Sequence, residues 1–399
     1  MADHLALPID VAWVSNGDTG ARNYDEFASH DEIAAVIRDR PASMLAVDMP
    51  HCTPDDLAAG RTFWDALPAA AGRLRRLKED GHFTRATDVV LPYRITSGDR
   101  TAYGVWAMVA TDEISTSADD PGRVIRNEDV FPEKVRERVA LTEALGHLVS
   151  AVLLVRTDGG EELTSALAAW CDAHEPAGRD VDEQGQVHEV WVMGASAERD
   201  RLLDVLNAGS MIVADGNHRS LAAQQGGLPA FLAVVTAPES VVIRPYNRLL
   251  HDLGMPVDDF LARLVEHGFT VEGLDRPAGV PAGSGQVELY VEGGSYAVGL
   301  PPVDGSVVDR LDHAVVERAL LGDVLGLGPD DERISYVGGD YGPDWLRGEV
   351  DAGRAVAAVL VAPVSTDDFL RVNSERMKMP RKSTWFTPKA RAGLVLAEL

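Results

Sequence analysis

A short polar stretch in the middle of the chain has the residue types of an anion-binding corner. The run Met211–Ala223 (MIVADGNHRSLAA) predicts a four-residue apolar strand, a polar turn (DGN) and a helix that begins at His218. The first N–H groups of a helix lack partners inside the helix and carry the positive end of its dipole, so such a corner can bind an anion through its backbone. Arg219 adds a guanidinium fork that can grip two phosphate oxygens.

An ordinary tight turn between a strand and a helix would carry the same residues. In that alternative Asp215 caps the helix, and His218 is a local hydrogen-bonding residue. In the functional alternative His218 donates to a phosphate oxygen, and Asp215 binds Mg²⁺ or orients His218. One glycine and one arginine do not decide between the two.

Glu128 is the candidate general base. It precedes a predicted helix over 132–145 that carries Lys134, Arg136 and Arg138, so basic neighbours are expected to fix its orientation. A carboxylate aimed at a substrate hydroxyl can take its proton during attack on phosphorus. The alternative is a carboxylate at a helix start or an ordinary ion-pair partner.

The C-terminal residues reverse the sign of a chain whose formal net charge is −26. Residues 371–391 hold one acid, Glu375, and these basic residues: Arg371, Arg376, Lys378, Arg381, Lys382, Lys389 and Arg391. In one interpretation Lys382, Ser383 and Thr384 are donors on a phosphate- or carboxylate-facing loop stiffened by flanking prolines. In the other, the segment docks on the acidic body of the protein. Arg248 is either a second phosphate fork or a carboxylate partner.

Composition limits the class of protein. With 399 residues, 45% hydrophobic and 25% charged, the chain can form two or three packed units of a soluble globular protein. The acidic balance argues against a nucleic-acid surface. Cys52 and Cys171 stand far apart without metal-ligand spacing, so neither a disulfide framework nor a zinc site is expected. No apolar run approaches 18 residues, and the N-terminus lacks signal-peptide features, which predicts a cytoplasmic protein without a membrane partner.

The elements around the corner predict a mixed α/β fold. From Val187 onward the pattern is strand, helix, strand, turn, helix, strand, as in a layered α/β unit that binds ligands beyond the carboxyl ends of its strands. Hairpins are expected around Gly98-Asp99 and Gly293-Gly294, and Ser43–Asp48 is expected to be a buried strand. Three portions are predicted: a mixed α/β portion over 1–115, the phosphate-binding unit over 116–250, and an α/β portion with the basic loop over 251–399.

Several runs resemble known family motifs. The pattern D-G-x-H-R-x-x-A from Asp215 resembles the G-x-x-R-x-x-A phosphate motif of the ParB/sulfiredoxin superfamily, and it is more similar to the A-D-G-H-H-R signature of the domain-of-unknown-function family 1015 (DUF1015). Three further runs resemble that family in order along the chain: Arg126-Asn127-Glu128, Pro245–Leu250 (PYNRLL) and Met379–Lys389 (MPRKSTWFTPK). Asn217 stands where sulfiredoxins carry a reactive cysteine and cannot act as a thiol nucleophile, which disfavours sulfiredoxin chemistry.

The resemblance implies a ParB/sulfiredoxin-like layered unit and a function similar to that of free serine kinases. It implies a nucleotide-dependent kinase that uses ATP or ADP with Mg²⁺ and phosphorylates a hydroxyl of a small metabolite, with free serine or a related amino acid as the candidate. Glu128 would activate the acceptor, and Mg²⁺ would bridge phosphate oxygens near Asp215. The phosphates would be held by Asp215, Gly216, Asn217, His218 and Arg219, with Arg248, Lys382, Ser383 and Thr384 as additional candidates.

Two other classes of function remain open. One is a non-catalytic nucleotide-binding switch of the ParB type, in which bound ATP or CTP changes a contact with a partner or within a homodimer. The other is an uncharacterised binding or structural protein that retains the pocket. A kinase requires Glu128 close to the Asp215 turn, whereas a switch requires only the turn and a nucleotide-sensitive surface.

Overall fold

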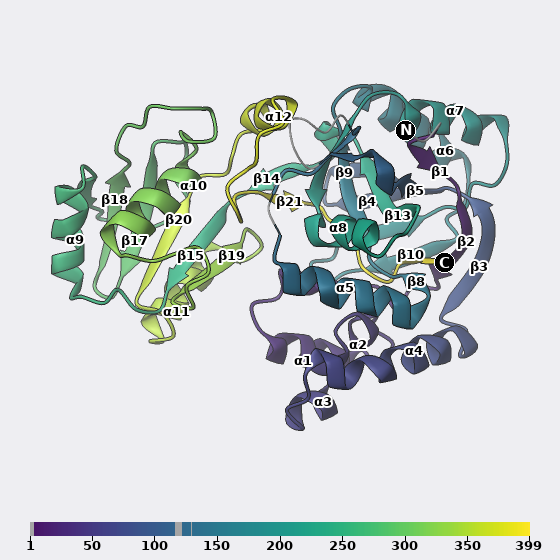
Figure 1. Cartoon of the computed structure of the whole chain (residues 1–399), viewed down its shortest axis with the longest axis horizontal. Helices are drawn as coiled ribbons and strands as arrows, with labels where there is room; N and C mark the ends of the chain where they lie inside the picture. The colour runs from purple at the N-terminus through teal and green to yellow at the C-terminus, as the bar shows by residue number, and fades with distance from the viewer. Residues whose placement is uncertain (1–3, 116–121, 129) are drawn as a thin grey trace. The chain divides into compact units, whose positions relative to one another are not determined.

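The computed structural model describes residues 4–115, 122–128 and 130–399 (Figure 1). It has a mixed α/β fold, as the sequence predicts. Its contacts group the chain into two compact units. Unit 1 comprises Met1–Val241 and Pro388–Leu399, and unit 2 comprises Val242–Thr387. Unit 2 is therefore an insertion in the sequence of unit 1, and the last residues of the chain belong to unit 1.

The main sheet of unit 1 runs through both of the first two predicted portions. Its strands, in spatial order, are β10 (Gly178–Val181), β11 (Val187–Val190), β4 (Leu91–Ser97), β5 (Arg100–Ala110), β13 (Ala230–Thr236), β9 (Val152–Arg156), β12 (Met211–Asp215), β7 (Val124–Ile125) and β6 (Ile114–Ser115), and β1 (Ala6–Leu7) also pairs with β5. The hairpin predicted at Gly98-Asp99 is confirmed as β4–β5. Because β5 pairs with β13 along the whole of β13, the structure does not separate the chain at residue 115.

The sheet is mixed rather than parallel around the corner. Strand β9 is parallel to β13 but antiparallel to β12, so the carboxyl end of β12 lies beside the amino end of β9. The carboxyl ends of the parallel strands β9 and β13 therefore lie at the edge of the sheet opposite to the carboxyl end of β12, so the rule for parallel strands does not account for the corner. A register shift between Val213 and Asp215 bulges β12 just before the turn, and such bulges re-aim a side chain.

Two groups of helices flank this sheet. Helices α6 (Gly160–Ala173) and α7 (Ala197–Asn207) pack on each other and bury leucines four residues apart, Leu163 and Leu167 in α6. Helix α8 (Asn217–Gln225) packs on α5 (Pro132–Leu145), and α5 packs on α4 (Phe63–Glu79), as Figure 1 shows. The predicted helix over 132–145 is thus confirmed as α5.

The N-terminal segment of unit 1 forms a helical layer and contributes two strands to a second sheet. The sheet contains β3 (Phe83–Val89), β2 (Ile9–Ser15), β22 (Val395–Glu398) and β8 (His147–Leu148) in that order. The helical layer contains η1 (Tyr24–Glu26), α1 (His30–Asp39), α2 (Leu45–Asp48), η2 (Pro50–Cys52) and α3 (Pro54–Ala58). The predicted strand Ser43–Asp48 is wrong, because α2 occupies it. A short apolar run that is buried on all sides does not distinguish a strand from a helix.

Unit 2 is built on one antiparallel sheet. Its strands, in spatial order, are β16 (Thr270–Gly273), β18 (Gly294–Gly299), β17 (Gln286–Val291), β20 (Ala357–Val361), β15 (Tyr246–Leu250) and β19 (Ile334–Gly338). The hairpin predicted at Gly293-Gly294 is confirmed as β17–β18. Its helices are α9 (Val257–Glu266), α10 (Asp312–Val315) continuing into the π-helix η5 (Val316–Val324), α11 (Pro343–Asp351) and α12 (Thr366–Ser374). The first and last strands of the insertion, β14 (Val242–Arg244) and β21 (Trp385–Thr387), pair with each other as a two-stranded antiparallel ribbon.

None of the helices among the described residues combines the length and the apolar character that crossing a membrane requires.

Candidate functional site

The predicted corner is present at the end of β12. Gly216 has a φ of +95°, and α8 begins at the next residue. A Cβ added at Gly216 would lie 3.2 Å from the Cα atom of Val152 and 3.0 Å from the Nε atom of Arg219. The turn therefore needs glycine both for its backbone conformation and for its close approach to β9. Asp215 does not cap α8, because the N-cap residue is Gly216, so that alternative interpretation is wrong.

Arg219 is buried inside the corner. One of its terminal nitrogens, Nη2, donates to Oδ2 of Asp215, and the other, Nη1, donates to the carbonyl oxygen of Ala151 and, at 3.3 Å, to Oδ1 of Asn23. Burial disfavours the charged guanidinium, but Asp215 and other acidic neighbours outweigh burial and raise the pKa of Arg219. Arg219 is therefore a fixed cation beside the first turn of α8.

A second buried cation comes from the C-terminal segment. The Nζ atom of Lys389 donates to Oδ1 of Asp215 at 2.9 Å and lies 4.0 Å from Oε1 of Glu26. Burial opposes the ammonium charge, yet Asp215 and Glu26 together raise the pKa of Lys389. Asp215 is thus shared between two cations, one on each carboxylate oxygen.

Glu26 completes this group, which we call the corner network: Asn23, Glu26, Asp215, Arg219 and Lys389. Asn23 donates to Oε1 of Glu26 from its backbone at 3.1 Å and from its side chain at 2.7 Å. Burial raises the pKa of Glu26 to about 7, against the opposing effect of Lys389. A buried carboxyl group that titrates near neutral pH beside a cation is suited to proton transfer.

The segment that carries Glu128 is held against the first turn of α8. Asn217 donates its Nδ2 hydrogen to Oδ1 of Asn127 at 3.1 Å, and both side chains are buried. Phe131 donates its backbone N–H to Nε2 of His218 at 3.0 Å, and the two rings stack with centroids 5.8 Å apart. Glu128 lies half-buried between these two attachment points. Its role as a base stays a prediction.

The contacts of His218 define its protonation. Because Nε2 accepts the N–H of Phe131, that nitrogen carries no proton, and the ring is the neutral tautomer with hydrogen on Nδ1. His218 could therefore donate to a phosphate oxygen only through Nδ1. This hydrogen bond joins residues 87 positions apart in sequence, and the role of His218 as a phosphate donor stays a prediction.

Not all of the basic residues that follow Glu128 in the sequence are available to fix its orientation. Arg138 is buried, donates to Oδ1 of Asp48 at 2.8 Å and lies 4.5 Å over the ring of Tyr24. Burial raises the pKa of Tyr24 to about 12, so this phenol stays protonated. Arg138 therefore connects α5 to the N-terminal helical layer.

The arrangement does not fit the Mg²⁺ site predicted at Asp215. Magnesium requires carboxylate oxygens that can face the ion. Both oxygens of Asp215 face cations, Lys389 on Oδ1 and Arg219 on Oδ2. Two positive groups in contact with the carboxylate oppose a dication at the same place.

Four of the predicted phosphate ligands belong to unit 2. Arg248 is fully buried, donates to Oε1 of Glu317 at 2.9 and 2.8 Å and to the carbonyl oxygen of Tyr246 at 2.7 Å, and lies over the ring of Tyr336. This is the carboxylate partner of the alternative interpretation rather than an available fork.

The other three predicted phosphate ligands of unit 2 are consecutive residues of the basic loop. Lys382 lies 5.4 Å over the ring of Tyr246, Ser383 is buried, and Thr384 is half-buried. Elsewhere in the tail, Arg381 pairs with Asp330 at 2.8 Å, and Arg391 pairs with Glu183 at 3.1 Å. Much of this basic segment thus pairs with acids of its own unit, as the docking interpretation predicts.

Sequence reasoning missed two members of the corner network, Asn23 and Glu26. A third member, Lys389, was noted only as part of the basic tail and of a family motif. Lys389 could have been identified as a site residue from its place at the end of the run MPRKSTWFTPK, beyond the loop residues chosen as donors. Asn23 and Glu26 carry no comparable local signal.

The chain belongs to the DUF1015 family, described as a protein of unknown function, whose model matches residues 17–314. No curated protein matches the chain.

Solved structures resemble part of the chain. A free serine kinase variant in complex with AMP is 12% identical over 72% of this chain and 92% of its own, with a TM-score of 0.40. A conserved hypothetical protein from Pyrococcus furiosus is 12% identical over 72% of this chain and 95% of its own, with a TM-score of 0.39. A C-terminally truncated SbnI from Staphylococcus aureus is 11% identical over 72% of this chain and 84% of its own, also with a TM-score of 0.39.

Proposed function

We propose that the corner network is the phosphate-binding site of a nucleotide-dependent kinase that phosphorylates a hydroxyl of a small metabolite, with free serine or a related amino acid as the first candidate. The observation that carries the proposal is the meeting of two buried cations, Arg219 and Lys389, at the N-terminus of α8 behind a left-handed glycine. A helix N-terminus with two adjacent cations favours a phosphate chain.

One further feature supports a ligand at this helix end. The Oδ1 atom of Asn217 is buried and has no hydrogen-bond partner among the described residues, although Nδ2 of the same side chain is bonded to Asn127. A buried acceptor without a donor costs roughly 1–3 kcal/mol, so it calls for a group that donates to it. A substrate hydroxyl or ammonium group would satisfy Oδ1.

The proposed reaction transfers the terminal phosphoryl group of ATP or ADP. The acceptor oxygen attacks the terminal phosphorus, the bond from phosphorus to the bridging oxygen of the nucleotide breaks, and the hydroxyl proton passes to a carboxylate. Glu128 is the proposed proton acceptor, and Glu26 is the second candidate because its pKa of about 7 lies near the working pH. Arg219 and Lys389 would stabilise the charge on the transferred group.

A phosphate that enters the corner must compete with Asp215 for the two cations. This competition is the observation that favours the second candidate function, a non-catalytic nucleotide-binding switch. In a switch, the nucleotide would displace Asp215 from Arg219 and Lys389, and the released carboxylate and C-terminal segment would change a contact elsewhere.

The two functions are separated by binding and turnover measured on the same protein. Wild type is titrated with ATP, ADP and CTP and incubated with a panel of hydroxy-amino acids and sugars, and phosphorylated products are followed by mass spectrometry. Arg219→Lys keeps the charge but loses the fork, so we expect nucleotide affinity to fall roughly 10- to 100-fold. Arg248→Lys, a buried arginine of unit 2, is the matched control and should bind nucleotide as wild type does.

The candidate bases are compared by rate. Replacement of the true base by the isosteric amide should lower kcat by about 10²–10⁴-fold while nucleotide affinity stays unchanged. Glu128→Gln and Glu26→Gln are therefore assayed in parallel. Nucleotide binding without turnover for any acceptor would favour the switch, and no binding of ATP, ADP or CTP by wild type would overturn both functions.

A further inference from the structure

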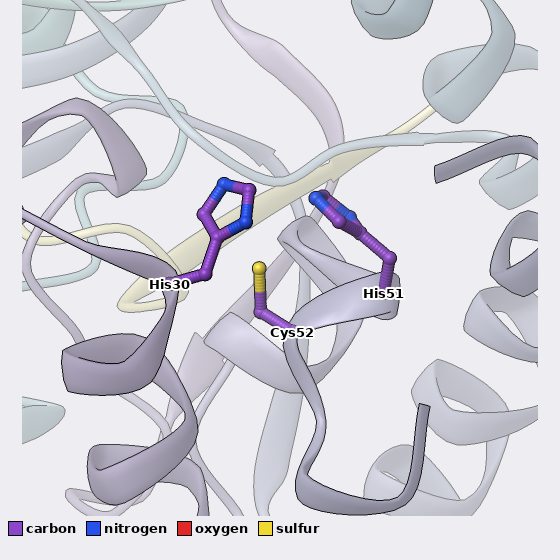
Figure 2. A group of neighbouring side chains, drawn as sticks. All are labelled: His30, His51 and Cys52. Carbon is purple, nitrogen blue, oxygen red and sulfur yellow. The ribbon is translucent and has the colours of Figure 1, made fainter. Parts of the chain in front are cut away.

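Two histidines and a cysteine from different elements converge in the N-terminal helical layer of unit 1. His30 is the first residue of α1, and His51 and Cys52 are the last two residues of η2. One ligand atom from each of the three side chains lies within 4.8 Å of the other two. Figure 2 shows the imidazole rings of His30 and His51 on either side of the sulfur of Cys52. The ring centroids of the histidines are 5.0 Å apart in an edge-to-face arrangement.

The burial of Cys52 and of one ring nitrogen of His51 distinguishes this cluster from a chance group of surface side chains. Cys52 is fully buried in the core of the helical layer, whereas His30 is exposed. The Nδ1 atom of His51 is buried and has no hydrogen-bond partner among the residues that the structure describes. Buried polar atoms are almost always satisfied, and an unsatisfied one calls for an explanation such as a bound ion.

We propose that His30, His51 and Cys52 form a binding site for Zn²⁺ or a similar borderline divalent metal. Imidazole and thiolate ligands select zinc, cobalt, nickel or copper over magnesium and calcium, which prefer oxygen ligands. Three protein ligands leave the fourth tetrahedral position for water. Among the residues that the structure describes, these three form a group of His, Cys, Asp or Glu side chains whose ligand atoms all lie within 4.8 Å of one another.

The geometry needs only a small adjustment to bind the metal. Zinc lies about 2.3 Å from sulfur and about 2.0–2.1 Å from imidazole nitrogen, so tetrahedral ligand atoms are roughly 3.5 Å apart. The present separations of up to 4.8 Å must therefore close by about 1 Å. The exposed side chain of His30 can rotate to supply this movement, while His51 and Cys52 stay fixed in η2.

Binding is coupled to release of a proton. Cys52 binds the metal as the thiolate, so the metal replaces the thiol hydrogen, which passes to solvent as a proton. The metal would join the start of α1 to η2 and so close the chain between residues 30 and 51. Its role is therefore to stabilise the helical layer, and it does not depend on the kinase proposal.

The test uses the full chain after removal of bound metal with a chelator. Zn²⁺ alone is titrated into wild type, and Co²⁺ is used as a spectroscopic probe, because a thiolate ligand gives a charge-transfer band. We expect one zinc per chain, a thiolate–cobalt band, and a melting temperature that rises with zinc. Cys52→Ser and His51→Gln should weaken zinc binding roughly tenfold or more and abolish the rise, and Cys52→Ser should also abolish the band.

Matched controls keep the result decisive. Cys171→Ser removes the other cysteine, which is buried in α6, and His267→Ala removes an exposed histidine of unit 2, and both should behave as wild type. If Cys52→Ser or His51→Gln fails to fold, His30→Ala serves instead, because that side chain is exposed. A wild type that binds no zinc, a cobalt complex without a thiolate band, or variants that bind zinc as tightly as wild type would overturn the proposal.

Discussion

Each unit of the protein buries an arginine that the sequence suggests as a phosphate ligand, yet the two arginines have different surroundings. Arg248 in unit 2 is paired with Glu317, bonded to a carbonyl oxygen of its own strand and covered by the ring of Tyr336. Arg219 in unit 1 shares its carboxylate, Asp215, with a second cation, Lys389, at a helix N-terminus.

The difference lies in charge balance. Arg248 and Glu317 neutralise each other, so an anion would gain little by entering. In the corner network Asp215 is divided between two cations, with Glu26 and Asp25 as further acidic neighbours, so an entering phosphate competes with a carboxylate that no single cation holds alone. Whether a buried arginine can bind a ligand thus depends on whether it shares its carboxylate with a second cation rather than on its own sequence motif.

The largest expected effect comes from removing each arginine. Arg219→Ala and Arg248→Ala should each destabilise their own unit by about 3–5 kcal/mol, because Glu317 loses its arginine and Asp215 loses one of its two cations. Hydrogen exchange followed separately in the two units would locate the loss. A change below about 1 kcal/mol at either position would show that its carboxylate reaches water instead.

The second effect is a pH dependence confined to unit 1. The folded-state pKa of Glu26, about 7, exceeds its ordinary value of 4.5, so its contribution to stability is complete below pH 4.5 and is lost as pH rises through 7. The loss should approach about 3 kcal/mol. Glu26→Gln should flatten this part of the profile, measured as urea unfolding at several pH values. An unchanged profile in the variant would assign the titration to another group.

Unit 2 should respond to pH in the opposite sense. His313 is buried near Arg248, and burial followed by that guanidinium lowers its pKa well below the ordinary value. The unfolded chain then binds a proton that the folded chain rejects, so the stability of unit 2 should fall as pH drops below about 6.5. His313→Leu should remove this dependence. The same loss on acidification in the variant would contradict the assignment.

A smaller effect tests the backbone of the corner. Gly216→Ala should cost about 1–3 kcal/mol and disturb Arg219, because the added Cβ meets Val152 and the guanidinium at a positive φ. Gly227→Ala, at the other end of α8, is the matched control, because it also has a positive φ but open space around its Cβ position. Equal losses of nucleotide affinity in both variants would remove the special role of the Gly216 turn.

The smallest effect concerns the basic loop of unit 2. Lys382→Met removes a cation that lies over the ring of Tyr246, which is worth about 0.5–1 kcal/mol at such a position. Thermal unfolding would measure this change. A loss of nucleotide affinity of roughly tenfold or more would instead restore Lys382 to the phosphate site proposed from the sequence.

Local patterns in the sequence were sufficient to predict several helices and strands and the turn at the corner itself. The alternation of apolar residues and the turn glycines predicted both hairpins, and helical periodicity predicted α5. The strand, glycine turn and helix start around Gly216 were also predicted, because each depends on residues a few positions apart. The family was recognised from motifs of the same short range. The strand predicted over Ser43–Asp48 was wrong, because a short run that is buried on all sides has no periodicity that distinguishes a strand from a helix.

Only the tertiary structure decided what these elements do together. Lys389 meets Asp215 across 174 positions of sequence, and Asn217 meets Asn127 across 90. His30 lies close to His51 and Cys52 although Cys52 and Cys171 stand far apart in sequence without metal-ligand spacing. The reason is physical: local propensity depends on neighbouring residues, whereas ion pairs and ligand clusters depend on strand order and helix packing, which the whole chain determines through burial of its cores.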